Sequence, residues 1–189
     1  YDTRSNVSQL LKNSYIQGKE HLLQGDSIFY DRNSGLGEVF GNMALHDTTN
    51  HIVVKGNYGY YNELTKFALA TGRAQMLQIS GLDTLFMHAD TFKVDPLPLE
   101  DSRIIRAYHN VKFYRFDLQG RCDSLVYDFR DSTSTMFHQP VVWAQGNQMT
   151  AQQVKMFMKN QLLHKVELLN TAFVIAPEDT SGYNQVKGK

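Results

Sequence analysis

A short pattern returns along the chain at nearly constant spacing, and this repeat restricts the fold more than any other feature of the sequence. Each copy has a small residue, then Asp, Asn or Gln, then alternating apolar residues, as in Gly-Asp-Ser-Ile-Phe-Tyr-Asp at 25–31. The polar positions of successive copies are 26, 57, 90, 123, 152 and 185, so the steps are 31, 33, 33, 29 and 33 residues. A period of this length is typical of arrays in which one supersecondary unit stacks on the next.

A second column of similar motifs lies between the copies of the first. Its members are at 41–45, 72–76, 109–113, 139–143 and 170–174, with steps of 31, 37, 30 and 31 residues. The one long step contains an insertion at 96–102, which has two prolines and is predicted to be a loop.

The segments between the columns have the composition of β-strands. Turn-forming residues occur at 32–35, 47–50, 80–83 and 118–120. Between these turns, apolar and polar residues alternate, and Val, Ile, Tyr and Phe are frequent, for example at 111–117. Each half-repeat is therefore one strand and a turn, and each full repeat is an antiparallel hairpin.

Each column motif falls near the middle of its strand, often on a glycine, which inside a strand marks a bulge or bend. Strands that all bend at the same level predict an all-β open β-jellyroll of long, V-shaped antiparallel strands. We expect one such domain over 15–189, preceded by an N-terminal extension at 1–14. The incomplete motif at 183–189 predicts that the domain is truncated from a longer protein at its C-terminus.

One segment has a competing interpretation. Val154, Met158, Leu162 and Val166 have helical spacing, and single-sequence propensity favours a helix over 149–169. The repeat instead divides this segment into two strands with a turn at 159–161. We predict the strands, because the repeat continues to Val186 only if they are present.

The alternation within each strand predicts which side chains point inward, where they form an apolar stripe along the array. The predicted inward residues are Ile28, Tyr30, Met43, Leu45, Tyr61, Met76, Phe92, Val94, Val111, Phe113, Leu125, Tyr127, Val141 and Trp143. The stripe is either the core of a β-sandwich or a groove that binds a lipid.

No catalytic constellation accompanies this pattern. The sequence lacks a Gly-rich phosphate loop with lysine, a Gly-x-Ser-x-Gly motif and a His-Glu-x-x-His motif. Asp26, Asp90 and Asp123 recur, but Asn and Gln replace them in other copies, so we expect them to bond local backbone at the bends. His46 and His51 lie in or beside a predicted turn, which favours solvation over metal binding. No cofactor and no metal site are predicted.

Charge and cysteine content exclude further classes. Lys plus Arg and Asp plus Glu are both 19, so there is no positive excess for nucleic-acid binding. The single cysteine, Cys122, occupies the small-residue position of its copy, which indicates a packing role. No run of 18 apolar residues occurs, and the first residues have no signal-peptide character. The chain is thus either cytosolic or a protein whose leader has been removed.

Together the motifs resemble the OstA-like family, the organic-solvent-tolerance domain of LptA-like periplasmic lipopolysaccharide-transport proteins. The resemblance covers residues 15–189 and rests on the order and spacing of the motifs at 25–31, 41–45, 70–74, 89–92, 107–114, 122–127 and 183–189. It implies a non-enzymatic periplasmic β-jellyroll of outer-membrane biogenesis in Gram-negative bacteria. It also implies an apolar interior that shields lipopolysaccharide acyl chains, and edge strands that pair with other OstA-like jellyrolls or further copies of the chain.

The hypothesis from the sequence is therefore a lipid-binding module. Charged replacements at Phe113 and Tyr127 are expected to abolish lipopolysaccharide co-purification without unfolding the domain. Two alternatives remain at this stage. The first is a structural β-scaffold that assembles edge to edge without lipid. The second is a carbohydrate-processing enzyme on a parallel β-solenoid, which the hairpin period and the lack of clustered Asp, Arg or Lys disfavour.

Overall fold

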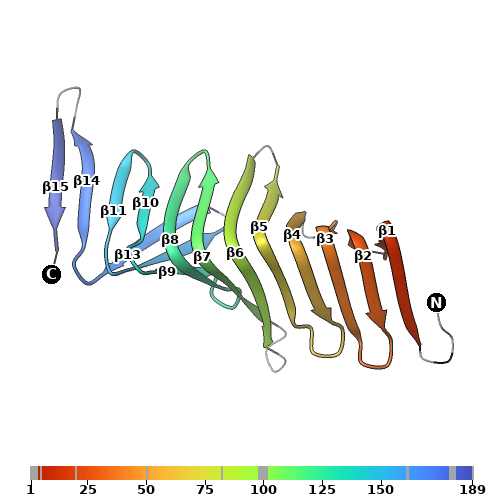
Figure 1. The fold of residues 1–189 in the computed structure, drawn as a ribbon. Helices are drawn as coiled ribbons and strands as arrows, with labels where there is room; N and C mark the ends of the chain where they lie inside the picture. Colours follow the sequence, from red (N-terminus) through yellow and green to blue (C-terminus); the bar gives the residue numbers. More distant parts are fainter. Residues whose placement is uncertain are drawn as a thin grey trace.

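The computed structural model describes residues 4, 6–19, 21–49, 51–81, 83–97, 102–160, 162–178 and 182–188. Within them, long antiparallel strands follow one another as hairpins in a single open sheet (Figure 1). The strands are β1 (Val7–Gln17), β2 (His21–Asp31), β3 (Leu36–Asp47), β4 (Ile52–Asn62), β5 (Ala68–Ser80), β6 (Asp83–Leu97), β7 (Ser102–Arg115), β8 (Leu118–Asp128), β9 (Thr133–Phe137), β10 (Val141–Ala144), β11 (Asn147–Thr150), β12 (Gln153–Lys159), β13 (Leu162–Leu169), β14 (Phe173–Glu178) and β15 (Gly182–Lys187). The predicted all-β class and the antiparallel bent strands are confirmed.

A line of bulges, which we call the crease, crosses the sheet. Its residue pairs are 12–13, 25–26, 41–42, 56–57, 72–73, 89–90, 109–110, 122–123, 138–139, 151–152 and 170–171. The pairing register is interrupted at each pair between β1 and β8, as expected where a bulge bends a strand. The crease therefore divides every long strand into two halves.

Beyond β8 the bend is sharp enough to split the sheet into two branches (Figure 1). The first half of β8 pairs with β10, and its second half pairs with β9. The branch that continues through β10, β11, β14 and β15 belongs to what we call the upper arm, at the top of Figure 1. The branch through β9, β12 and β13 belongs to the lower arm. Each pair β9–β10, β11–β12 and β13–β14 is one long strand divided at the crease.

Alternate strands bend by the same backbone conformation. Consecutive residues with positive φ occur in the second column at 41–42, 72–73, 109–110, 138–139 and 170–171, and also at 12–13. Only glycine adopts this region without steric cost, and other residues lose roughly 1–2 kcal/mol there. The crease therefore stores backbone strain at its non-glycine positions.

Replacing Thr171 by glycine tests this strain. Thr171 is β-branched and exposed with φ 49°, so Thr171→Gly is expected to raise the free energy of unfolding by about 1 kcal/mol. Thr135, in the extended strand β9, is the control, because Thr135→Gly should lower the same quantity. Urea unfolding of both variants measures the difference, and equal destabilisation would contradict a strained crease.

The strands that carry the first column of motifs have a different sequence at the crease: a small residue followed by an acidic or amide residue. Gly25, Ala89, Cys122 and Ala151 are buried at this position. A Cβ at Gly25 would lie 2.2 Å from Cγ1 of Val39, which explains why a small side chain is required there.

The crease aspartates bond to the neighbouring strand. The Nδ2 group of Asn42 donates to both carboxylate oxygens of Asp26 at 3.0 Å, and Nδ2 of Asn110 donates to Asp90 at 2.9 Å. His109 Nδ1 lies 3.1 Å from Asp123. The prediction that these carboxylates bond local backbone is corrected, because these partners are side chains on the next bent strand.

Three boundaries differ from the sequence predictions or refine them. β1 begins at Val7, so residues 7–14 of the expected extension pair with β2. Pro96 and Leu97 end β6 and Ser102 begins β7, so strand structure extends into the predicted 96–102 loop; 98–101 lie outside the described residues. The described residues of 149–169 form the end of β11 and all of β12 and β13, with Asn160 at φ 51° after β12, so the helical alternative is wrong.

Among the described residues, none belongs to a helix with the length and apolar character needed to cross a membrane.

Candidate functional site: two apolar rows inside the V

The upper and lower arms form a V whose inside is the face that the bend encloses. Directly paired residues on neighbouring strands share a face of a sheet, so the register shows which side chains line the inside of this V. On the upper arm, one row of paired residues is apolar or glycine on every strand. This upper inner row is Ile16, Leu23, Leu45, Val54, Met76, Met87, Phe113, Gly120, Val142, Met149, Val174 and Val186.

The lower arm has a matching row next to the crease. This lower inner row is Leu10, Ile28, Val39, Gly59, Ala70, Phe92, Ala107, Leu125, Met136, Val154 and Leu168, again without a polar side chain. Members of both rows belong to one continuous apolar cluster. The inside of the V is therefore apolar next to the crease on every strand that these two rows cross.

A third row, the lower rim row, lies two residues further from the crease. It contains Tyr30, Tyr61, Val94, Ile105, Tyr127, Met156 and Val166, interrupted by small residues. The Tyr30 hydroxyl donates to Glu63 at 2.6 Å. Tyrosine has an apolar body and a polar tip, which suits a border between an apolar interior and water.

The interior is tightly filled over most of its second half and more accessible at the terminal strands. Met136, Val142 and Val154 are 0% exposed, whereas Leu10 and Ile16 on β1 are 37% and 39% exposed and Val186 on β15 is 62% exposed. Half-buried apolar residues, including Leu23, Val54, Met76 and Met87, pack against the cluster at intermediate depth. Any ligand inside the V would therefore meet these half-buried positions before the closed floor.

Twelve of the fourteen predicted inward residues lie in these rows or beside the crease on the same face. Met43 and Val111 are the two beside the crease, and both are buried. Met43 lies against Gly59, where an added Cβ would come within 2.7 Å of the Met43 methyl carbon. Phe113 covers Gly120 in the same manner, with the Phe113 ring 2.3 Å from a hypothetical Cβ.

Val141 and Trp143 are the exceptions, and their predicted orientation is corrected. Val142 is fully buried in the upper inner row, whereas Trp143 is 37% exposed and its indole Nε1 donates to Gln148 at 3.0 Å. The sequence alignment of the repeat placed the bend at Gln139-Pro140. The positive-φ pair is instead His138-Gln139, and a shift of one residue reverses the face of every following side chain.

The fourteen predicted residues include six of the 23 members of the two inner rows and miss the other 17, although the signal was present. Leu23, Val54, Met87, Gly120 and Met149 each precede the small first-column residue by two positions. On the alternate strands, Val39, Ala70, Ala107, Met136 and Leu168 precede the positive-φ pair by two. Reading the alternation in both directions from the crease would have found them.

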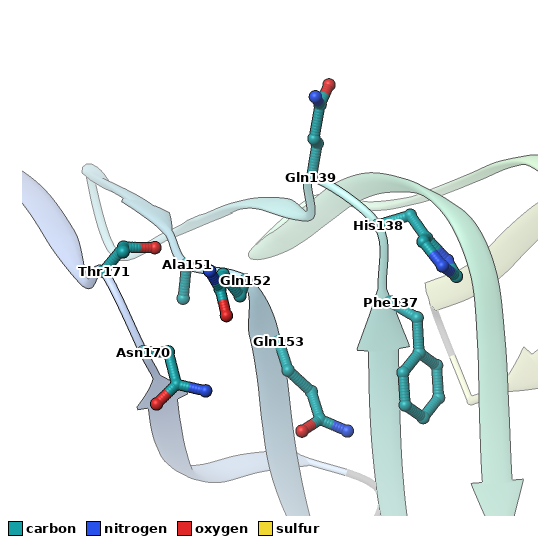
Figure 2. A pocket seen from close by; sticks show the side chains of 8 residues that line it. All are labelled: Phe137, His138, Gln139, Ala151, Gln152, Gln153, Asn170 and Thr171. Atoms are coloured by element: carbon teal, nitrogen blue, oxygen red, sulfur yellow. The ribbon is translucent and has the colours of Figure 1, made fainter.

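A separate cavity of about 570 Å³ opens at the crease where 137–139, 151–153 and 170–171 change arms (Figure 2). Most of its lining side chains are polar, namely those of His138, Gln139, Gln152, Gln153, Asn170 and Thr171. None of the predicted inward residues lines it. The cavity therefore does not extend the apolar interior.

The recurring aspartates, which the sequence offered as candidates for acid–base chemistry, form structural hydrogen bonds. The hydroxyl of Ser124 donates to Asp123 at 2.6 Å and, with His109, lowers the pKa of that carboxyl. No group of three or more His, Cys, Asp or Glu that could hold a metal occurs among the residues with described positions.

Cys122 is expected to be unreactive in the folded protein. Its side chain is buried, and desolvation raises the pKa of the thiol from 9.0 to about 12, so the nucleophilic thiolate is suppressed. A thiol reagent at mildly alkaline pH should react only after unfolding. The pKa of this thiol is higher in the folded protein than in the unfolded chain. Its contribution to the free energy of unfolding is therefore fully present below pH 9.0 and is lost as the pH rises toward about 12. Rapid labelling of native protein would contradict this burial.

Comparisons with known proteins give a likeness to a solved structure. No family model matches the chain, and no curated protein matches it. Among solved structures, the chain is similar to LptH from Pseudomonas aeruginosa, described as the LptA-homologous periplasmic component of the lipopolysaccharide transport device. The identity is 14%, the match covers 88% of this chain and 93% of that chain, and the TM-score is 0.40. A likeness at this level establishes neither a shared function nor a shared fold.

Proposed function

We propose that the chain is a lipid-binding module that shields acyl chains inside the V, acting in the periplasm in lipopolysaccharide transport and outer-membrane biogenesis. The observation that carries the proposal is the pair of uninterrupted inner rows beside the crease, since neither row contains a polar side chain. The lipid class and the compartment come from the OstA-like motifs.

The distribution of methionine supports a binding role over a purely structural core. All seven methionines of the chain are in the apolar cluster or pack against it: Met43, Met76, Met87, Met136, Met149, Met156 and Met158. Methionine is unbranched and polarisable, and it is common on surfaces that adapt to varied apolar ligands. A core selected only for rigidity would favour branched side chains.

The mechanism is passive. Transfer of acyl chains from water to the apolar rows is favourable by roughly 0.8 kcal/mol per buried methylene. Neighbouring positions along the rows are chemically alike, so a bound chain can move from strand to strand without a specific site to leave. The half-buried residues of β2 to β6 are the entry, because the floor of the second half is already filled.

The mouth of the lower arm offers a place for a headgroup. Arg103 lies beyond the lower rim row, and its guanidinium is 4.5 Å from the Phe129 ring centroid. Phe129 packs edge-on against Tyr127, with ring centroids 4.6 Å apart. This cation over an aromatic border is suited to an anionic headgroup whose acyl chains enter the interior.

Edge pairing is part of the proposal. β1 and β15 each pair on one side only within the part of the chain described, and such edges present unpaired backbone groups. Other OstA-like jellyrolls or further copies of this chain would extend both inner rows at β1 and the upper inner row at β15. This feature alone also fits the alternative of a scaffold that binds no lipid.

Mass spectrometry of lipids extracted from the purified protein separates the two functions. The transport module is expected to carry lipopolysaccharide or a related acylated lipid through purification. A preparation from lipopolysaccharide-producing cells that assembles into filaments but contains no lipid would favour the scaffold.

A further inference from the structure

The outer face of the upper arm carries a row of basic side chains on adjacent strands. Lys55, Gln75, His88, Lys112 and Arg121 are directly paired in that order from β4 to β8. Lys112 thus stands between His88 and Arg121. Cationic side chains directly opposite one another destabilise a sheet, so their arrangement calls for a negatively charged partner.

These cations also have no ion-pair partner among the described residues. Lys55, Lys112 and Arg121 are exposed, and none forms an ion pair with a described residue. Neither this basic row nor the next outer row of paired residues contains Asp or Glu along β1 to β15. The nearest carboxylates lie in the crease, where Asp26, Asp90 and Asp123 are hydrogen-bonded to Asn42, Asn110 and His109.

The lower arm provides the contrast within the same sheet. Lys93 and Arg106 on its outer face both bond Asp95, Lys155 lies 3.9 Å from Asp131, and Lys165 bonds Glu167. With a net charge of zero for the chain, this segregation leaves the outer face of the upper arm positive.

Exposed aromatic rings lie directly beside the basic row. Phe86 is 48% exposed, its partner Tyr114 is 53% exposed, and Trp143 follows two strands away in the same row. Phe116, in the β7–β8 turn, is 79% exposed. Cations combined with exposed rings are the composition of protein surfaces that lie at the headgroup level of a bilayer.

We propose that this outer face of the upper arm docks on the surface of an anionic lipid bilayer. Lys55, Lys112 and Arg121 would meet the phosphates while Phe86, Tyr114 and Phe116 enter the interfacial layer. A soluble polyanion would match the charge but would leave the rings of a broad, open face in water, so the bilayer is the better fit. The proposal is independent of what the interior binds.

Flotation of the purified chain with vesicles tests this docking. We expect it to float with vesicles of phosphatidylcholine and phosphatidylglycerol, to float much less with phosphatidylcholine alone, and to be released by high salt. The double variant Lys112→Gln/Arg121→Gln should bind anionic vesicles roughly 30-fold more weakly. The double variant Phe86→Ser/Tyr114→Ser should also reduce flotation. The salt dependence of its binding should be unchanged, because the cations are still present.

Control variants show whether docking depends on the outer face of the upper arm. Lys155→Gln/Lys165→Gln makes the same charge change on the lower arm and should float like the unaltered chain. Met76→Glu, inside the V, should also float, which separates docking from lipid uptake. Equal flotation of the Lys112/Arg121 variant and the unaltered chain would overturn the proposal, as would retention on heparin without vesicle binding, which would assign the face to a soluble polyanion.

Discussion

Met76→Glu is expected to lower the affinity for lipopolysaccharide by about 100-fold or more, so that the lipid no longer co-purifies. Met76 is half-buried in the upper inner row, directly paired with Val54 and Met87. A carboxylate there would lie among acyl chains, and removing an unpaired charge from water costs several kcal/mol. In the lipid-free protein the same side chain reaches water, so strand content should be retained.

Leu77→Glu is the matched control. Leu77 is the next residue of β5, is also half-buried, and points to the outer face beside Val53 and Phe86. This variant should carry as much lipid as the unaltered chain, measured by quantitative mass spectrometry of extracts. Lipid loss in both variants, or in neither, would show that the inner rows are not the binding surface.

The structure also explains why Phe113 is a poor choice for such a test. Phe113 is 6% exposed and its ring covers Gly120, so a charge at this position would remove a core contact. Loss of lipid from a charged Phe113 variant would then report unfolding. Tyr127 is half-buried and remains suitable for charged replacement.

Gly56→Ala is the second large effect, and it concerns the crease. A Cβ at this position would lie 2.7 Å from the carbonyl oxygen of Thr71, a backbone atom that a side-chain rotation cannot move. We expect the free energy of unfolding to fall by about 3 kcal/mol, the upper part of the range for overpacking. Urea unfolding with an unchanged m-value measures the effect.

Gly37→Ala is its control, because Gly37 also lies within a strand but has its nearest atoms at 3.6 Å and 3.7 Å, which is ordinary contact. This substitution should be neutral or stabilise by about 0.5–1 kcal/mol, since alanine has less freedom in the unfolded chain. Similar stabilities of the two variants would contradict a close approach of backbones at the crease.

The repeat predicted most of the fold because it combines two periods. Alternation at every second residue indicates strands, and a recurrence near 31–33 residues places a bend at one level on all of them. This regularity outweighed the helical spacing at 149–169, where local propensity alone would have given the wrong element. Each strand there pairs with a neighbour, which no local window can show.

The failures come from bends without a glycine. At His138-Gln139 and at Lys12-Asn13, non-glycine residues adopt positive φ, so no glycine marks the bend in the sequence. Because the bend at 138–139 was placed one residue too late, Val141 and Trp143 were predicted on the wrong face. Because the bend at 12–13 was not recognised, residues 7–14 were left outside the predicted domain. The basic row on the outer face was not predicted, because Lys112 and Arg121 become neighbours only through strand register.

The most direct test of the central claim uses two adjacent valines. Val54 faces the interior and Val53 faces outward, and both are half-buried on β4. A small photoreactive diazirine amino acid at each position, irradiated in lipopolysaccharide-producing cells, reports which face meets acyl chains. The account predicts a lipopolysaccharide adduct from position 54 that is far more abundant than any from position 53; adducts from 53 alone, or equally from both, would contradict it.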